Sequence, residues 1–312
     1  MNIKNGLKKI NGYYFKKKLV TSIIVGVFAI AAGVGAGIVI DKFVLGQISA
    51  NYDGMDAGDY SMDTDSFMEK YNALGNCDDY STKFTPAEMI NIGFTLYKRF
   101  DNTMSITKGT VHAAGTEQLI RAANVKADGE YLEESISLGV IPVATRTYQN
   151  SENIRLIRGT NIQAEGAVWP DECVVYTNEE YIEDFGKTPS DPCIYIISSK
   201  TITESSITRD GTDYVISTKL TKKSSVLNYI RQMKSISNLK EYPSFNKMEI
   251  TFTLDSNLLI KKAVTSEAYF ARTSSGLGST CDGGVTIEYF TDGNFTIPDR
   301  NTPINYSYQG AK

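Results

Sequence analysis

The sequence predicts an α+β domain in which a curved antiparallel β-sheet carries helices on one face, after an N-terminal transmembrane helix. Three observations lead to this prediction. Alternating apolar and polar residues recur over residues 103–290, which is typical of strands with one buried face and one face in water. Asp-Gly pairs at 128–129 and 210–211 separate neighbouring strand-like segments, as in β-hairpins. Capping boxes that begin at Thr85 and Thr177 mark the starts of amphipathic helices.

Residues 1–40 predict a single membrane span. Residues 1–18 contain six lysines and no acidic residue, and residues 19–40 continue for 22 residues without a charge. A helix of that length measures about 33 Å, which is enough for a hydrocarbon core of about 30 Å. The basic flank places the N-terminus in the cytoplasm and residues 41–312 outside the cell membrane. A cleaved signal peptide is the alternative, but the apolar run is longer than the apolar region of such peptides.

Charge restricts the partners of the exported part. The formal net charge of the chain is −4 and the basic head contributes +6, so residues 41–312 carry about −10. Nucleic-acid binding depends on clustered Lys and Arg, and therefore no nucleic-acid partner is expected. The chain has one histidine, His112, and no C-x-x-C motif. We therefore expect no metal site and no cofactor.

Four cysteines lie beyond the predicted span. An even number of cysteines in an oxidising compartment indicates disulfides, and four cysteines allow three pairings. A bond between Cys173 and Cys193 would close a short loop around a helix, and Cys77 would then join Cys281, near the other end of the domain. Free thiols are the alternative.

Residues 41–84 are expected to form an acidic stalk. Their apolar periodicity is weak, only one short helix near residues 66–74 is expected, and aspartates are frequent: Asp53, Asp56, Asp59, Asp63, Asp65, Asp78 and Asp79. A folded domain is predicted over residues 85–298. Residues 299–312 are expected to be a C-terminal tail.

Three helices are predicted inside the domain. The first follows the capping box Thr85–Glu88, with Pro86 at the first helical position, and the second follows the capping box Thr177–Glu180. Residues 222–237 form the third, because their apolar residues share one helical stripe: Val226, Tyr229, Ile230, Met233 and Ile236.

Strands are predicted on both sides of these helices. Two hairpins join residues 117–126 to 130–137 and residues 203–209 to 213–220. Residues 247–254 alternate most regularly, and a turn at 255–257 leads to a partner strand over 258–271. A final strand contains Val285, Ile287 and Tyr289, and the preceding glycines, Gly276, Gly278, Gly283 and Gly284, are expected to form a turn.

No residue pattern predicts catalysis, and we expect the protein not to be an enzyme. His112 lies in a predicted strand, with no nucleophile motif nearby. Glu133 and Glu134 are neighbours in a strand and therefore point to opposite faces, so they do not form a carboxylate pair.

The layout of residues 85–298 resembles the exported half-barrel lipid carriers, which include the lipoprotein carrier LolA and mycobacterial lipoproteins of the LppX type. The capped first helix, the strand–Asp-Gly–strand pairs, the helix at 222–237 and the strands around Asp255 carry this resemblance. It implies a curved sheet roofed by helices and binding of a lipid. Members of this family usually have a lipobox or a cleaved signal, whereas a retained anchor is expected here, and no ligand residue can be transferred.

The sequence therefore predicts a membrane-anchored extracytoplasmic binding protein of a bacterial cell envelope, with a lipid or another apolar ligand. The expected site lies between the sheet and the 222–237 helix and is lined by Met233, Ile250 and Phe252, although the same residues could fill a solid core. The alternative function is a structural component of an envelope assembly, because the bitopic assembly factors of type IV secretion and conjugation channels share this plan. Its partners would be envelope proteins or copies of this chain.

Overall fold

The computed structural model describes residues 51–310 apart from positions 76, 114, 140–141, 164–165, 238 and 273–277. The predicted basic head at 1–18 and the predicted membrane span at 19–40 lie outside the described residues. Among the helices that are described, none is both long enough and apolar enough to cross a membrane.

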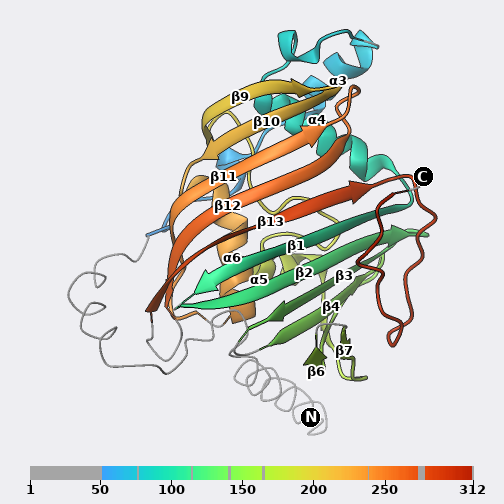
Figure 1. The fold of residues 1–312 in the computed structure, drawn as a ribbon, viewed down its shortest axis with the longest axis vertical. Helices are drawn as coiled ribbons and strands as arrows, with labels where there is room; N and C mark the ends of the chain where they lie inside the picture. Colours follow the sequence, from blue (N-terminus) through green and yellow to red (C-terminus); the bar gives the residue numbers. More distant parts are fainter. Residues whose placement is uncertain are drawn as a thin grey trace, which may run out of the picture.

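An open antiparallel sheet of 11 strands forms the body of the protein (Figure 1). Its strand order is β8-β5-β4-β3-β2-β1-β13-β12-β11-β10-β9, so β8 and β9 are its two edges. The strands are β1 (Thr103–Ala113), β2 (Thr116–Ala127), β3 (Glu130–Leu138), β4 (Val143–Gln149), β5 (Ile154–Arg158), β8 (Val174–Tyr176), β9 (Ile202–Asp210), β10 (Asp213–Leu220), β11 (Ser244–Leu254), β12 (Ile260–Arg272) and β13 (Gly278–Phe290). A small second sheet pairs β6 (Thr160–Gln163) with β7 (Gly166–Val168). The predicted α+β class with an antiparallel sheet is confirmed.

Both predicted hairpins are present. Asp128 and Gly129 have φ values of 53° and 78°, as the central residues of a type I′ turn require. In the second hairpin Asp210 pairs with Asp213, so the loop consists of Gly211 and Thr212. The turn therefore lies one residue later than the Asp-Gly pair at 210–211 indicates.

Glycines allow the backbones of the central strands to approach closely. Gly283 and Gly284 lie inside β13, so the prediction that they belong to a turn is wrong. A Cβ atom at Gly284 would lie 2.0 Å from the carbonyl oxygen of Thr265, and one at Gly109 would lie 2.2 Å from the carbonyl oxygen of Gly284. Glycine inside a strand commonly marks such an approach.

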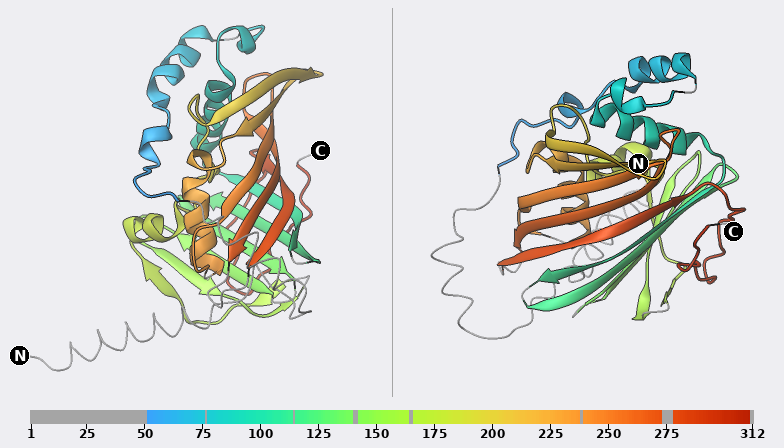
Figure 2. Two further views of the ribbon diagram at one scale, coloured as in Figure 1. Left: turned by 90° about the vertical axis from the view of Figure 1, so that its left-hand side faces the viewer. Right: turned by 45° about the horizontal axis from the view of Figure 1, so that its top comes forward.

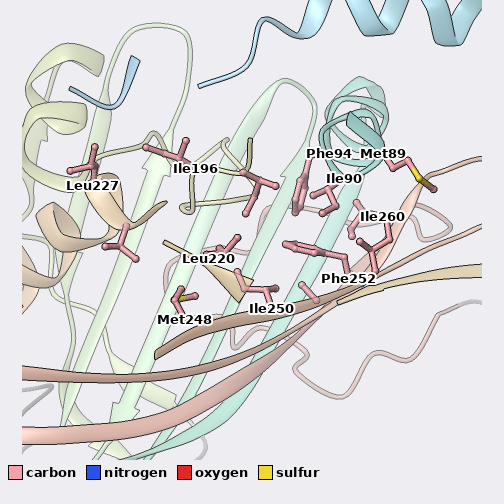
Figure 3. Packing of buried hydrophobic residues seen from close by; sticks show 14 of the residues in the cluster. Met89, Ile90, Phe94, Ile196, Leu220, Leu227, Met248, Ile250, Phe252 and Ile260 are labelled. Atoms are coloured by element: carbon pink, nitrogen blue, oxygen red, sulfur yellow. The ribbon is translucent and has the colours of Figure 1, made fainter. Parts of the chain in front are cut away.

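The α-helices of the described residues lie on one face of the sheet, which we call the inner face (Figure 2). They are α3 (Thr64–Leu74), α4 (Pro86–Arg99), α5 (Asn178–Phe185) and α6 (Leu227–Ser237), with short 3₁₀ turns at Gly58–Tyr60, Tyr80–Thr82 and Ser224–Val226. Both predicted capping boxes are formed: the Glu88 amide donates to Thr85 Oγ1, and the Glu180 amide donates to Thr177 Oγ1. The largest hydrophobic core fills the space between α3, α4 and α6 and strands β10, β11 and β12 (Figure 3).

The expected stalk is instead part of this core over its described residues. Tyr52, Phe67, Tyr80 and Phe84 are buried in the main cluster, and the Tyr52 hydroxyl donates to the Pro243 carbonyl at 2.8 Å. The helix expected near residues 66–74 is present as α3. The stalk prediction is wrong for residues 52–84 because large aromatic side chains are buried here without a regular spacing.

The C-terminal segment covers the outer face of the sheet, opposite the helices (Figure 1). Ile304 is buried against Met104, Val125 and Leu132, and Tyr306 and Tyr308 pack beside it. The expectation of a free tail over 299–312 is therefore wrong for the residues up to 310.

A buried ion pair fastens this segment to β3 and β4. Arg146 and Glu134 are paired on the outer face, and their side chains are only 1% and 3% exposed. Arg146 also donates to the carbonyl oxygens of Asp299, Arg300 and Thr302, while the Tyr306 hydroxyl donates to Glu134 at 2.6 Å. The guanidinium further lies 4.8 Å from the centre of the Trp169 ring.

The expected disulfides are absent, since all four cysteines are free. Cys173 is exposed beside an outer-face groove, whereas Cys193 lines a cavity on the inner face, so the sheet separates them. Cys77 lies near the edge of the sheet, because the carbonyl oxygen of its neighbour Asp78 accepts a hydrogen bond from Arg209 on the edge strand β9. Cys281 lies inside β13, in the middle of the strand order, so these two cysteines are also apart. Burial raises the pKa of Cys193 to about 11 and that of Cys281 to about 12, which favours the protonated thiols.

Candidate ligand-binding cavity

A cavity of about 230 Å³ lies on the inner face of the sheet, beneath α5, α6 and residues 187–195. Its apolar lining comes from helices and strands that are distant in the sequence: Phe94, Ile120, Leu156, Phe185, Ile250 and Phe252. The two halves of the sheet therefore line one cavity, and the alternation within a single strand does not predict this convergence.

The wall of the cavity below α4 is built from aromatic rings. Phe94 and Phe252 meet edge to face, with ring centres 6.0 Å apart, and Phe94 meets Tyr289 at 5.7 Å. Figure 3 shows Phe94 and Phe252 between α4 and the sheet, with Ile250 on the neighbouring part of β11. Because the rings are fixed by their mutual packing, this wall is preformed.

The floor of the cavity is polar. Small hydroxyl side chains from the inner faces of β1, β3, β4 and β12 line it: Ser105, Thr107, Ser135, Thr145, Thr147 and Thr265. Asn124 donates to the Ser105 hydroxyl at 3.4 Å, and the buried Oδ1 atom of Asn124 has no hydrogen-bond partner. The cavity thus has an apolar wall and a floor that can donate and accept hydrogen bonds.

A buried carboxyl group joins the floor to the roof. Glu267 on β12 accepts hydrogen bonds from the Tyr229 hydroxyl on α6 at 3.0 Å and from the Tyr195 hydroxyl at 3.4 Å. Burial raises the pKa of Glu267 to about 7, although the two tyrosine hydroxyls act in the opposite direction. Glu267 therefore titrates in the neutral range.

This titration predicts a pH-dependent stability. The pKa of Glu267 is about 7 in the folded protein and about 4.5 in the unfolded chain. The contribution of Glu267 to the free energy of unfolding is therefore fully present below pH about 4.5 and is lost as the pH rises through about 7. Glu267→Gln removes this dependence. The free energy of unfolding of the variant minus that of the wild type should therefore rise by up to about 3 kcal/mol between these pH values. Urea unfolding at several pH values measures this difference, and a difference that does not change with pH would contradict the assignment.

The predicted site residues are only partly brought together. Ile250 and Phe252 line the cavity, whereas Met233 is buried in the core and does not line it. Helix α6 contributes Tyr229 and Ile236 instead. The role of Ile250 and Phe252 in binding stays a prediction.

Sequence reasoning missed the charged residues of the cavity. Glu267 lies two residues after Thr265 on β12, and both side chains point to the inner face. The alternation over 258–271 could therefore have shown that Glu267 lies on the buried face of this strand. Glu133 lies on the inner face and Glu134 on the outer face, as predicted for neighbours in a strand. His112 is 54% exposed, 3.8 Å from Glu117, and no group of His, Cys, Asp and Glu within the described residues is arranged to hold a metal.

Comparison with known proteins gives no family. No family model matches the sequence, and no curated protein shows significant similarity to it. Among solved structures, the Mycobacterium tuberculosis lipoprotein LppX aligns with 65% of this chain and 92% of its own, at 8% identity and a TM-score of 0.28. A DUF1329 family protein from Desulfovibrio piger aligns with 65% of this chain and 89% of its own, at 8% identity and a TM-score of 0.22. These values are too low to support a functional argument.

Proposed function

We propose that this protein is a membrane-anchored extracytoplasmic binding protein whose ligand is a lipid or another apolar molecule, and that it is not an enzyme. The cavity on the inner face supports the proposal. Its preformed aromatic wall lies beside a polar floor, which is the usual composition of a site for a small organic ligand. The apolar residues of the lining would be in contact with the hydrocarbon part of the ligand.

The alternative, a structural part of an envelope assembly, does not need this cavity. A scaffold gains stability from a filled core, because empty space beside apolar side chains loses packing contacts. The cavity of about 230 Å³ between the helices and the hydroxyl-lined floor therefore favours binding over a purely structural role.

The test is to fill the cavity. Ala122 lies on the inner face of β2, between Thr107 of β1 and Ser135 of β3, and borders the cavity. We expect full-length protein to bind the uncharged fluorophore N-phenylnaphthylamine saturably, and Ala122→Phe to weaken this binding about tenfold or more while thermal unfolding changes little.

Lys108→Phe is the matched control. Lys108 is exposed in β1 beside Thr107, so it points to the outer face and should leave fluorophore binding unchanged. If the wild type binds no fluorophore saturably and instead forms a defined oligomer, the scaffold alternative replaces the proposal.

A further inference from the structure

The charged side chains of the cavity are paired with one exception. Glu133 accepts from Lys187 at 3.1 Å, and Asp191 is paired with Lys98. Glu267 accepts hydrogen bonds from two tyrosine hydroxyls. Arg158 also lines the cavity, but it has no ion pair or side-chain hydrogen bond to any of the described residues.

Arg158 is partly buried. Its Nε atom is buried without a hydrogen-bond partner, and its removal from water lowers the pKa of Arg158. Leu156 precedes it on β5 and packs with Tyr181 and Phe185 of α5, and the phenol groups of Tyr176 and Tyr181 act on its charge without a hydrogen bond to it. A guanidinium keeps its charge in such surroundings, and a donor that is removed from water without a partner is costly.

Arg146 on the outer face shows how this chain satisfies a buried guanidinium elsewhere. Its guanidinium is paired with the carboxylate of Glu134 and donates to three carbonyl oxygens. Arg158 has neither kind of partner within the described residues. The missing partner is therefore expected to come from the contents of the cavity.

We propose that Arg158 binds the anionic group of an amphiphilic ligand, which carries a carboxylate or a phosphate at one end of a long hydrocarbon chain. The proposal rests on the binding function above and specifies its ligand class. The forked N–H groups of arginine match the two oxygens of either anion. The hydrocarbon chain would extend from Arg158 along Leu156 and Phe185 toward the aromatic wall formed by Phe94 and Phe252.

Displacement of N-phenylnaphthylamine from full-length protein tests the proposal with three ligands of equal chain length. Hexadecanoate and hexadecyl phosphate carry the anion, and hexadecanol does not. We expect both anionic ligands, or one of them, to bind about tenfold tighter than hexadecanol or more, as a charged hydrogen bond implies. The relative affinity of the two anions distinguishes a fatty acid from a phosphate-bearing lipid.

Two variants locate the effect. Arg158→Met should lose about tenfold or more of the affinity for the anionic ligand and keep the affinity for hexadecanol. Arg155→Met is the matched control, because Arg155 is exposed on the same strand and lies beside Tyr148 on the outer face, 6.0 Å from its ring centre. It should change neither affinity.

Each outcome decides the proposal. Equal binding of the three ligands by the wild type, or unchanged anion binding by Arg158→Met, overturns the role of Arg158 and leaves the apolar binding function intact. Absence of saturable binding of all three ligands overturns both. If Arg158→Met does not fold, the selectivity of the wild type between hexadecyl phosphate and hexadecanol decides, together with Arg158→Lys, which should keep part of that selectivity.

Discussion

Replacing Arg146 by Met is expected to lower the free energy of unfolding by about 3–5 kcal/mol. The substitution leaves the carboxylate of Glu134 buried with only the Tyr306 hydroxyl, and it removes the donor to the carbonyl oxygens of Asp299, Arg300 and Thr302. Chemical denaturation measures the loss. Because these contacts attach the C-terminal segment, limited proteolysis should also cleave that segment sooner in the variant.

Two further variants distinguish the effect of a buried ion pair from that of an exposed ion pair. Lys219→Met removes an exposed partner of Glu204 and should cause no measurable change. The double variant Glu134→Leu, Arg146→Met removes both buried charges and should recover much of the lost stability, since apolar replacement of a whole buried pair is often neutral. A loss for Arg146→Met as small as that for Lys219→Met would show that the pair does not hold the segment.

Replacing Phe252 by Ala is expected to lower the free energy of unfolding by about 3–5 kcal/mol, the range for a buried Phe. Its side chain is 1% exposed and packs edge to face on Phe94, and it contributes to the cavity lining, so its removal enlarges the cavity. The same change removes part of the preformed wall and should weaken the binding of N-phenylnaphthylamine.

Phe245→Ala is the control for this prediction. Phe245 is a buried residue of the same strand that packs on Tyr229 and Tyr269 without lining the cavity. It should cost similar stability and leave fluorophore binding nearly unchanged. Equal effects of the two substitutions on fluorophore binding would mean that the Phe252 ring makes no specific contribution to the binding site.

Local patterns in the sequence predict the elements of this fold well. The alternation over 247–254 places Met248, Ile250, Phe252 and Leu254 on the buried inner face, because a strand repeats every two residues. The side-chain hydroxyls of Thr85 and Thr177 predict helix starts, because each accepts a backbone hydrogen bond three residues later.

Long-range packing is what the sequence does not predict. Tyr52 and Ile304 belong to segments of irregular polarity, and each is buried only because a distant part of the sheet offers an apolar surface. The cavity has the same origin, since it needs β5 and β11, which are seven positions apart in the strand order, to face the same helices. Arg158 gives no local signal because its unpaired state depends on this arrangement.

The most direct test of the central claim is to locate an apolar ligand on full-length protein. A long-chain alkyl diazirine without a charged group can be bound, activated by light and mapped by mass spectrometry of peptides. We predict labelling of peptides that contain Ile250 and Phe252 of β11 and Ile236 of α6, and loss of this labelling with excess hexadecanol. Labelling confined to residues 1–50 or to the outer face around Ile304, with none on β11 and α6, would contradict the claim that the inner-face cavity binds the ligand.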